Sequence, residues 1–116
     1  LREIVDGRDE VPGLRQARSV SVNGGLSLLA GSSSATYYLT DGKLYRKVCT
    51  TPPCSLEDPV TPSGGSEVLA DVQQFQVTRS GRLLTVTLEV RTPASGTGGS
   101  ATGIRLTTKV LGRNLP

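Results

Sequence analysis

Histidine, methionine and tryptophan are missing from this sequence, and only two cysteines and one phenylalanine occur in its 116 residues. Without histidine, the chain has no Ser-His-Asp or Cys-His catalytic site of its own and no histidine-ligated metal. A general base would have to be a carboxylate, a lysine or a tyrosine with a shifted pKa, and no pair of acidic residues has the apolar neighbours that would shift it. The sequence therefore predicts a protein that is not an enzyme and that needs no cofactor or metal.

Long apolar segments are missing as well. No stretch of about 18 or more apolar residues occurs, so nothing in this sequence is predicted to span a membrane as a helix. No secretory signal pattern is visible either. The chain begins at Leu1, which indicates a mature or shortened form of a longer protein.

The composition favours a small β-rich domain. Aromatic residues make up only 3% of the chain, so the core must consist mostly of Leu, Val and Ile. The 14 glycines and seven prolines predict many turns and few long helices. The net charge of +3 is mildly basic and does not by itself indicate a nucleic-acid partner.

The two cysteines, Cys49 and Cys54, enclose the segment CTTPPC. An even pair around two prolines predicts a local disulfide and an oxidising, exported location. In the chain-entropy description, closing such a short loop stabilises the fold by about 2 kcal/mol. Metal binding is the alternative, but two thiols without a third ligand make a poor site.

The order of predicted elements gives an α+β fold class. Residues 1–18 are predicted to be the end of an N-terminal helix, interrupted at Gly7 and at Pro12-Gly13. An antiparallel β-meander follows over residues 19–116, and the helical segment is expected to pack on it within a single domain, residues 1–116. Alternating apolar and polar residues predict strands at 19–22, 26–30, 35–48 (a hairpin), 73–79, 82–91 and 104–110. Residues 50–66, rich in Pro and Gly, are predicted to be an irregular loop.

All three tyrosines lie in the predicted hairpin ATYYLTDGKLYRKV. The Asp41-Gly42 pair predicts a type I′ turn, which places Tyr38 opposite Tyr45. This pair shares its face with Lys43 and Lys47, and we expect that face to lie at a solvent edge. Tyr38, Tyr45, Lys43 and Lys47 are therefore a candidate protein interface, and a simple cross-strand stabilising pair is the alternative.

Four segments in this order resemble the globular head of type IV pilin-like proteins: LRQARSV, the tyrosine hairpin, VLADVQQFQVTRSGRLLTVTLEVR and LTTKVLGRN. The likeness is strongest to minor pilins of the W type and J-type pseudopilins of type II secretion. It implies a structural subunit of a type IV pilus, competence or type II secretion filament, with other pilin or pseudopilin subunits as partners.

The resemblance also implies a hydrophobic N-terminal anchor helix that this chain does not contain. Such a helix would hold the subunit in the inner membrane, with its head in the periplasm, before assembly. After assembly, the subunit would belong to a periplasmic or extracellular filament.

An alternative function is DNA or ligand binding during DNA uptake. Arg91, Arg105 and Lys109 are predicted to line one polar strand face, which could contact DNA phosphates. Few aromatic residues interleave them, so base stacking is unsupported. An ordinary charged outer face is the simpler explanation.

Two further patterns are weak. Residues 96–101 fit G-x-G-x-x-A, but a predicted strand follows them where a dinucleotide site needs a helix. The acidic residues Asp6, Asp9 and Glu10 do not have the spacing of a calcium loop, and a solvated helix face explains them.

Overall fold

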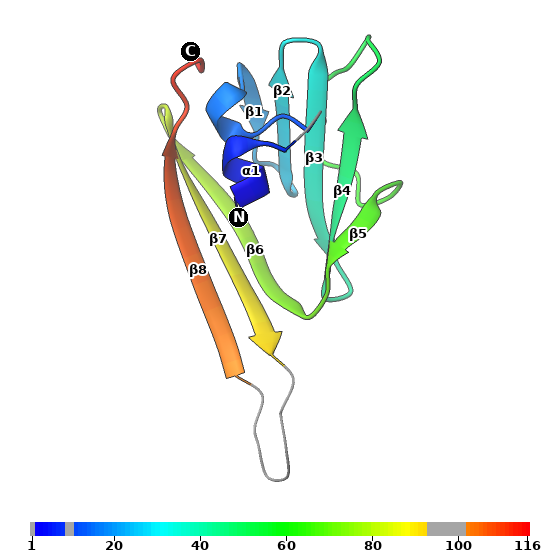
Figure 1. Cartoon of the computed structure of the whole chain (residues 1–116), viewed down its shortest axis with the longest axis vertical. Helices are drawn as coiled ribbons and strands as arrows, with labels where there is room; N and C mark the ends of the chain where they lie inside the picture. Colours follow the sequence, from blue (N-terminus) through cyan, green and yellow to red (C-terminus); the bar gives the residue numbers. More distant parts are fainter. Residues whose placement is uncertain (1, 9–10, 93–101) are drawn as a thin grey trace.

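The computed structural model describes residues 2–8, 11–92 and 102–116, and it contains two antiparallel sheets (Figure 1). Strands in each sheet follow one another in sequence order, so both sheets are meanders. The first sheet consists of β1 (Ser19–Ser21), β2 (Leu26–Ala30), β3 (Ser33–Thr40), β4 (Lys43–Cys49) and β5 (Ser66–Leu69). The second consists of β6 (Val72–Ser80), β7 (Leu83–Thr92) and β8 (Thr102–Leu111).

Helical structure in the described residues is limited to α1 (Arg2–Asp6) and the 3-10 turn η1 (Leu14–Gln16). The predicted α+β fold class, with a helix over residues 1–18 packed on the sheet, is therefore wrong, because the chain is nearly all antiparallel β. Gly7 has a φ of +80°, which ends α1 after its fifth residue. The chain then turns back, and Gly13 packs against the end of α1.

The tyrosine hairpin forms as predicted. Asp41 and Gly42 have φ values of 51° and 73°, as a type I′ turn requires. The predicted register between β3 and β4 is confirmed, with Tyr38 opposite Tyr45 and Leu39 opposite Leu44.

One hydrophobic core joins both sheets with α1 and η1. From Leu84 onward, apolar side chains of β7 alternate with polar ones, and Leu84, Val86 and Leu88 are buried on the inner face. Ile4 and Val5 of α1 and Leu14 of η1 belong to the same core cluster, and Figure 1 shows α1 in front of the sheets. The core comprises Ile4, Val5, Leu14, Ala17, Leu26, Leu28, Ala35, Tyr37, Leu44, Val72, Val77, Leu84, Val86, Leu88, Val110 and Leu115.

Backbone hydrogen bonds hold the two sheets together where the chain passes from β5 to β6. The N–H of Val72 donates to the carbonyl of Gly42 in the hairpin turn, at 2.8 Å. The N–H of Arg91 donates to the carbonyl of Asp71, also at 2.8 Å. Strand β6 consequently lies beside β3 and β4.

Gly13 gives a test of how α1 is held. A Cβ at this position would lie 2.2 Å from the Gly7 nitrogen and 2.7 Å from the Val5 carbonyl oxygen, so Gly13→Ala must push α1 away from η1. We expect a loss of about 3 kcal/mol in the free energy of unfolding, measured by urea denaturation. Hydrogen exchange at the Gly7 amide, which donates to the Glu3 carbonyl, should also accelerate.

Gly31→Ala is the matched control. Gly31 has a positive φ of 60°, but nothing lies within 4 Å of its Cβ position. This variant should lose only about 1 kcal/mol through backbone strain and leave exchange at the Gly7 amide unchanged. Equal losses in both variants would contradict the close packing of α1 on Gly13.

Candidate functional site

The outer face of the first sheet, which we expected at a solvent edge, is partly covered by residues 50–65. Tyr38 is only 3% exposed, and its hydroxyl accepts a hydrogen bond from the Gly65 N–H at 2.9 Å. The Tyr38 and Tyr45 rings stack with centroids 5.2 Å apart. The Lys47 Nζ lies 5.3 Å from the centroid of the Tyr38 ring. The expectation of a solvent-facing tyrosine pair is therefore wrong for Tyr38.

The covering loop is fixed by polar contacts with the sheet. Lys47 Nζ donates to Glu57 Oε1 and to the Thr61 carbonyl, both at 2.8 Å. The Glu57 N–H donates to the Ser27 hydroxyl at 2.9 Å, and the N–H of the buried Val60 donates to a carbonyl in the turn before β2. The loop thus satisfies polar groups on a sheet face that would otherwise be left to water.

Of the four residues in the candidate tyrosine interface, two are committed to contacts within the chain. Tyr38 is buried, and Lys47 binds the loop. Tyr45 remains partly exposed, and the exposed Lys43 lies 3.4 Å from the Glu67 carboxylate. The interface assignment stays a prediction, with Tyr45 and Lys43 as the parts that another protein could reach.

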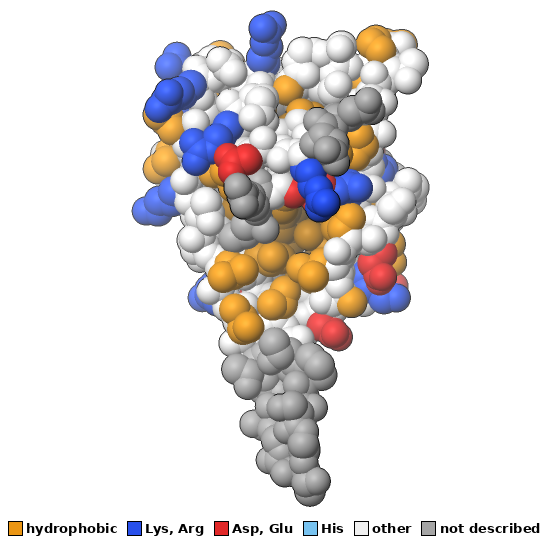
Figure 2. All heavy atoms as spheres, in the orientation of Figure 1, with side chains coloured by type: hydrophobic (Ala, Val, Ile, Leu, Met, Phe, Trp, Pro, Cys, Tyr) orange, Lys and Arg blue, Asp and Glu red, His pale blue; other side chains and the backbone are white. Residues whose placement is uncertain are grey.

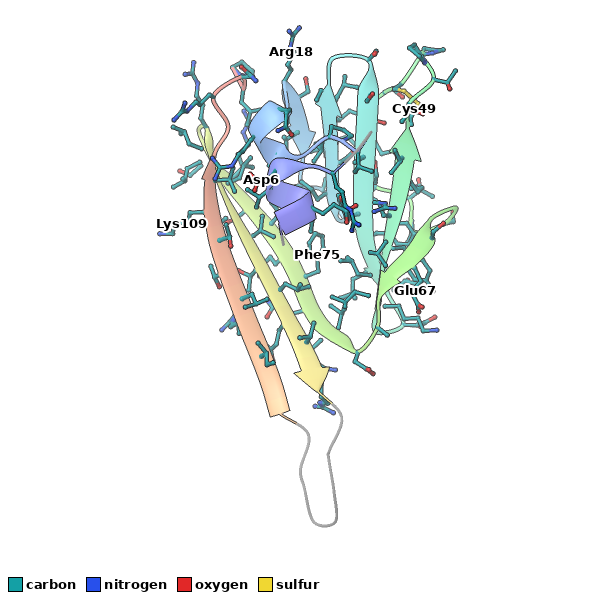
Figure 3. The ribbon with its side chains drawn as sticks, viewed as in Figure 1. Asp6, Arg18, Cys49, Glu67, Phe75 and Lys109 are labelled. Carbon is teal, nitrogen blue, oxygen red and sulfur yellow. A yellow bond between two sulfur atoms is a disulfide. The ribbon has the colours of Figure 1, made fainter. Side chains whose placement is uncertain are left out.

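The predicted disulfide between Cys49 and Cys54 is confirmed. It lies at the end of β4, where it ties the start of the covering loop to the sheet (Figure 3). Both thiols are consumed by the bond, so neither can ligate a metal. In the described parts of the chain, no group of three or more Cys, Asp or Glu side chains is arranged to hold a metal ion.

The cations proposed for DNA contact share a strand face, as alternation predicts. Arg91, Arg105 and Lys109 lie on the outer face of the second sheet, and Figure 3 shows Lys109 pointing away from β8. Glu89 stands directly opposite Arg105 and lowers the positive charge in the middle of this stripe. Arg105 also lies 3.5 Å from the Gln74 side-chain oxygen. DNA contact stays a prediction.

The inner face of the same sheet is only partly buried. We call its incompletely buried part the open apolar face, which consists of Phe75, Val90, Ile104 and Leu106 around the buried Leu88. Cross-strand pairing places Leu88 beside Leu106 and Val90 beside Ile104. Ile104 and Leu106 are 43% and 44% exposed, although they continue the surface that is buried near the start of β7.

The open apolar face lies next to the point where the chain enters α1. Figure 2 shows hydrophobic side chains gathered below α1, over the lower half of β6, β7 and β8. Figure 3 places Phe75 near the first turn of α1. Because α1 is only five residues long, it covers the upper part of the inner face and leaves the lower part open.

Among the described residues, the Tyr37 hydroxyl is the one buried side-chain polar group that lacks a hydrogen-bond partner. The Glu3–Arg46 ion pair nevertheless lies close to it. Burial raises the pKa of Tyr37 above its usual value; the Glu3 charge raises it further, and Arg46 lowers it. A cleft of about 380 Å³ is lined nearby by Glu3, Arg8, Val11, Arg46 and Val68.

The remaining sequence candidates do not form a site in the described residues. Asp6 pairs with Arg15, as a solvated surface carboxylate would. Asp9, Glu10 and the glycine-rich residues 96–101 lie outside the described residues. No helix in the ranges 2–8, 11–92 and 102–116 has the length and apolar character needed to cross a bilayer.

Two adjacent tyrosines allow a matched test of these environments. Tyr38→Phe removes the acceptor for the Gly65 N–H and should lower the free energy of unfolding by about 1 kcal/mol. Tyr37→Phe removes a hydroxyl that has no partner, so it should be neutral or stabilising. Urea denaturation of both variants measures the difference. A larger loss for Tyr37→Phe than for Tyr38→Phe would show that the Tyr37 hydroxyl does have a partner.

Comparison of this chain with protein-family models, with curated protein sequences and with solved structures finds no match in any of the three.

Proposed function

We propose that this chain is the head of a non-enzymatic structural subunit that assembles into a filament of the cell envelope, of the type IV pilus, competence or type II secretion kind. The assignment of a minor pilin or pseudopilin comes from the sequence resemblance. The single observation that carries the assembly role is the open apolar face. A surface of this kind on a domain is typically a place where another polypeptide binds.

The position of the open apolar face supports a tether as well as a contact. The first described residue of α1 is Arg2, and Figure 3 places Phe75 near this end of the helix, so a segment joined there would start close to this face. An apolar anchor segment, which the resemblance implies, would therefore find an apolar surface where it meets the head. The inner membrane before assembly and sister subunits afterwards are the proposed partners.

The disulfide supports a location outside the cytoplasm. The bond between Cys49 and Cys54 fixes the start of a loop that partly covers the outer face of the first sheet. Disulfides persist in oxidising compartments such as the periplasm and the cell surface. An exported subunit would keep this loop in place, whereas a reducing compartment would open the bond.

An assembly role also fits the chemistry of the side chains. Several acidic groups in the described residues are paired with basic ones, as in Arg15–Asp6, Lys43–Glu67 and Lys47–Glu57. Such surface ion pairs contribute little to stability, and charged groups of this kind help to select the binding partner. We therefore propose that this domain acts by binding other subunits through complementary surfaces.

Ile104→Glu tests the proposal in the complete native gene product, produced in its own cells. Ile104 is 43% exposed, so a charge there should leave the head folded but should disrupt an apolar contact. We expect the wild-type protein in sheared or envelope-bound filaments, and at least a tenfold loss of the variant from that fraction, about 1.4 kcal/mol of contact energy. Immunoblotting of the fractions measures it.

Gln76→Glu is the control, because it adds the same charge on the exposed outer face of the same sheet. This variant should enter filaments like the wild type. Recovery of the wild-type protein only as a free monomer would refute the assembly role. Normal incorporation of Ile104→Glu would show that the open apolar face is not the contact.

A further inference from the structure

Strand β8 forms a long free edge of the second sheet. It pairs with β7 on one side, and in the described chain no strand lies on its other side. Residues 103–107 of β8 are all exposed, so neither face of the strand is covered there. Strand β6, at the other edge of the sheet, lies beside β3 and β4. Figure 1 shows β8 at the outer left border of the molecule.

Side chains of β8 differ in character between its two faces. Ile104 and Leu106 point to the inner side, and Arg105 and Lys109 point to the outer side. If β8 paired with β8 of a second copy around Thr107, Arg105 of each copy would stand opposite Lys109 of the other. Like charges directly opposite each other are destabilising, so this symmetric pairing is disfavoured.

Strand β5 has the complementary character. It is the edge of the first sheet, and all four of its residues are exposed. Glu67 lies on the outer side, opposite Tyr45, and Val68 lies on the inner side with 36% exposure. The contact of Glu67 with Lys43 joins two half-exposed side chains at 3.4 Å, and such surface pairs hold a carboxylate only weakly.

We propose that β5 of one copy of this chain adds to β8 of the next copy as an antiparallel strand. With Glu67 opposite Thr107, the carboxylate lies diagonal to both Arg105 and Lys109. Diagonal neighbours are about 7–8 Å apart, within reach of long side chains. The same register places Val68 opposite Leu106, so exposed apolar side chains meet on the inner side.

This pairing repeats from copy to copy. Strands β8 and β5 lie on opposite sides of the molecule, and in Figure 1 β8 runs up the view while β5 runs down it. A contact between two different surfaces does not close into a symmetric pair, and it continues as an open chain unless it forms a ring. The pairing rests on the proposed assembly role. It adds to that role the two strand edges through which copies would join.

A strand of four residues gives a small contact, so the pairing is weak for free molecules. In a filament, other contacts hold the copies side by side and raise the effective concentration of each edge. The free chain should therefore show the contact at high concentration, through the residues of β5 and β8 alone.

The experiment is an NMR dilution series from about 1 mM downward, because that concentration detects millimolar dissociation constants. In the wild type, the amide signals of β5 and of 103–109 should shift with concentration. Two charge-reversed variants, Arg105→Glu/Lys109→Glu and Glu67→Lys, should each associate about tenfold more weakly than the wild type. A mixture of the two variants should recover association, because the reversed β8 then meets a reversed β5.

Arg18→Glu/Arg113→Glu is the matched control, since it reverses two exposed charges that lie outside β5 and β8 and should associate like the wild type. A wild type without concentration-dependent shifts, or a mixture without recovery, would overturn the pairing. In either case, loss of Ile104→Glu from filaments would leave the assembly role standing. If the free protein associates through these edges but the native gene product is absent from filaments, the assembly role is refuted and the strand pairing stands.

Discussion

The structure depends on one constraint: α1 and η1 are short, so they cover only part of the inner surface of the sheets. Strand β7 presents an unbroken apolar row to the inside, from Leu84 to Val90. Its upper part is buried by Ile4 and Leu14, while its lower part is left partly open. With one Phe and three Tyr, the chain has few large aromatic side chains that could close the gap. The surface that we propose for assembly would therefore arise from incomplete burial rather than from a separate binding motif.

Local patterns are sufficient to predict most strands. The Asp41-Gly42 turn fixes the register of the hairpin, because a two-residue loop allows the two flanking strands to pair in only one register. Alternation also places Arg105 and Lys109 on one face of β8. The short spacing of the two cysteines predicts their bond. Each of these features is decided by residues close together in sequence.

Features that depend on distant residues are not predicted by such patterns. The helical pattern of residues 1–18 does not reveal that Gly7 turns the chain back on Gly13. The burial of Tyr38 depends on a loop that returns to the sheet at Gly65. Alternation predicts the inward direction of Ile104, but it carries no information about which element covers it. Local sequence thus predicts the sheet face to which a side chain points, whereas packing between distant segments decides whether that side chain is buried.

Exposed apolar strands usually invite aggregation, and the charges on β8 limit this risk. Arg105 and Lys109 make two identical β8 edges repel in the symmetric register, so this pairing of β8 with itself is disfavoured. A neighbour that supplies a carboxylate at the right position removes that repulsion. The same two charges thus act against one kind of contact and in favour of another, which is how an edge can be both protected and specific.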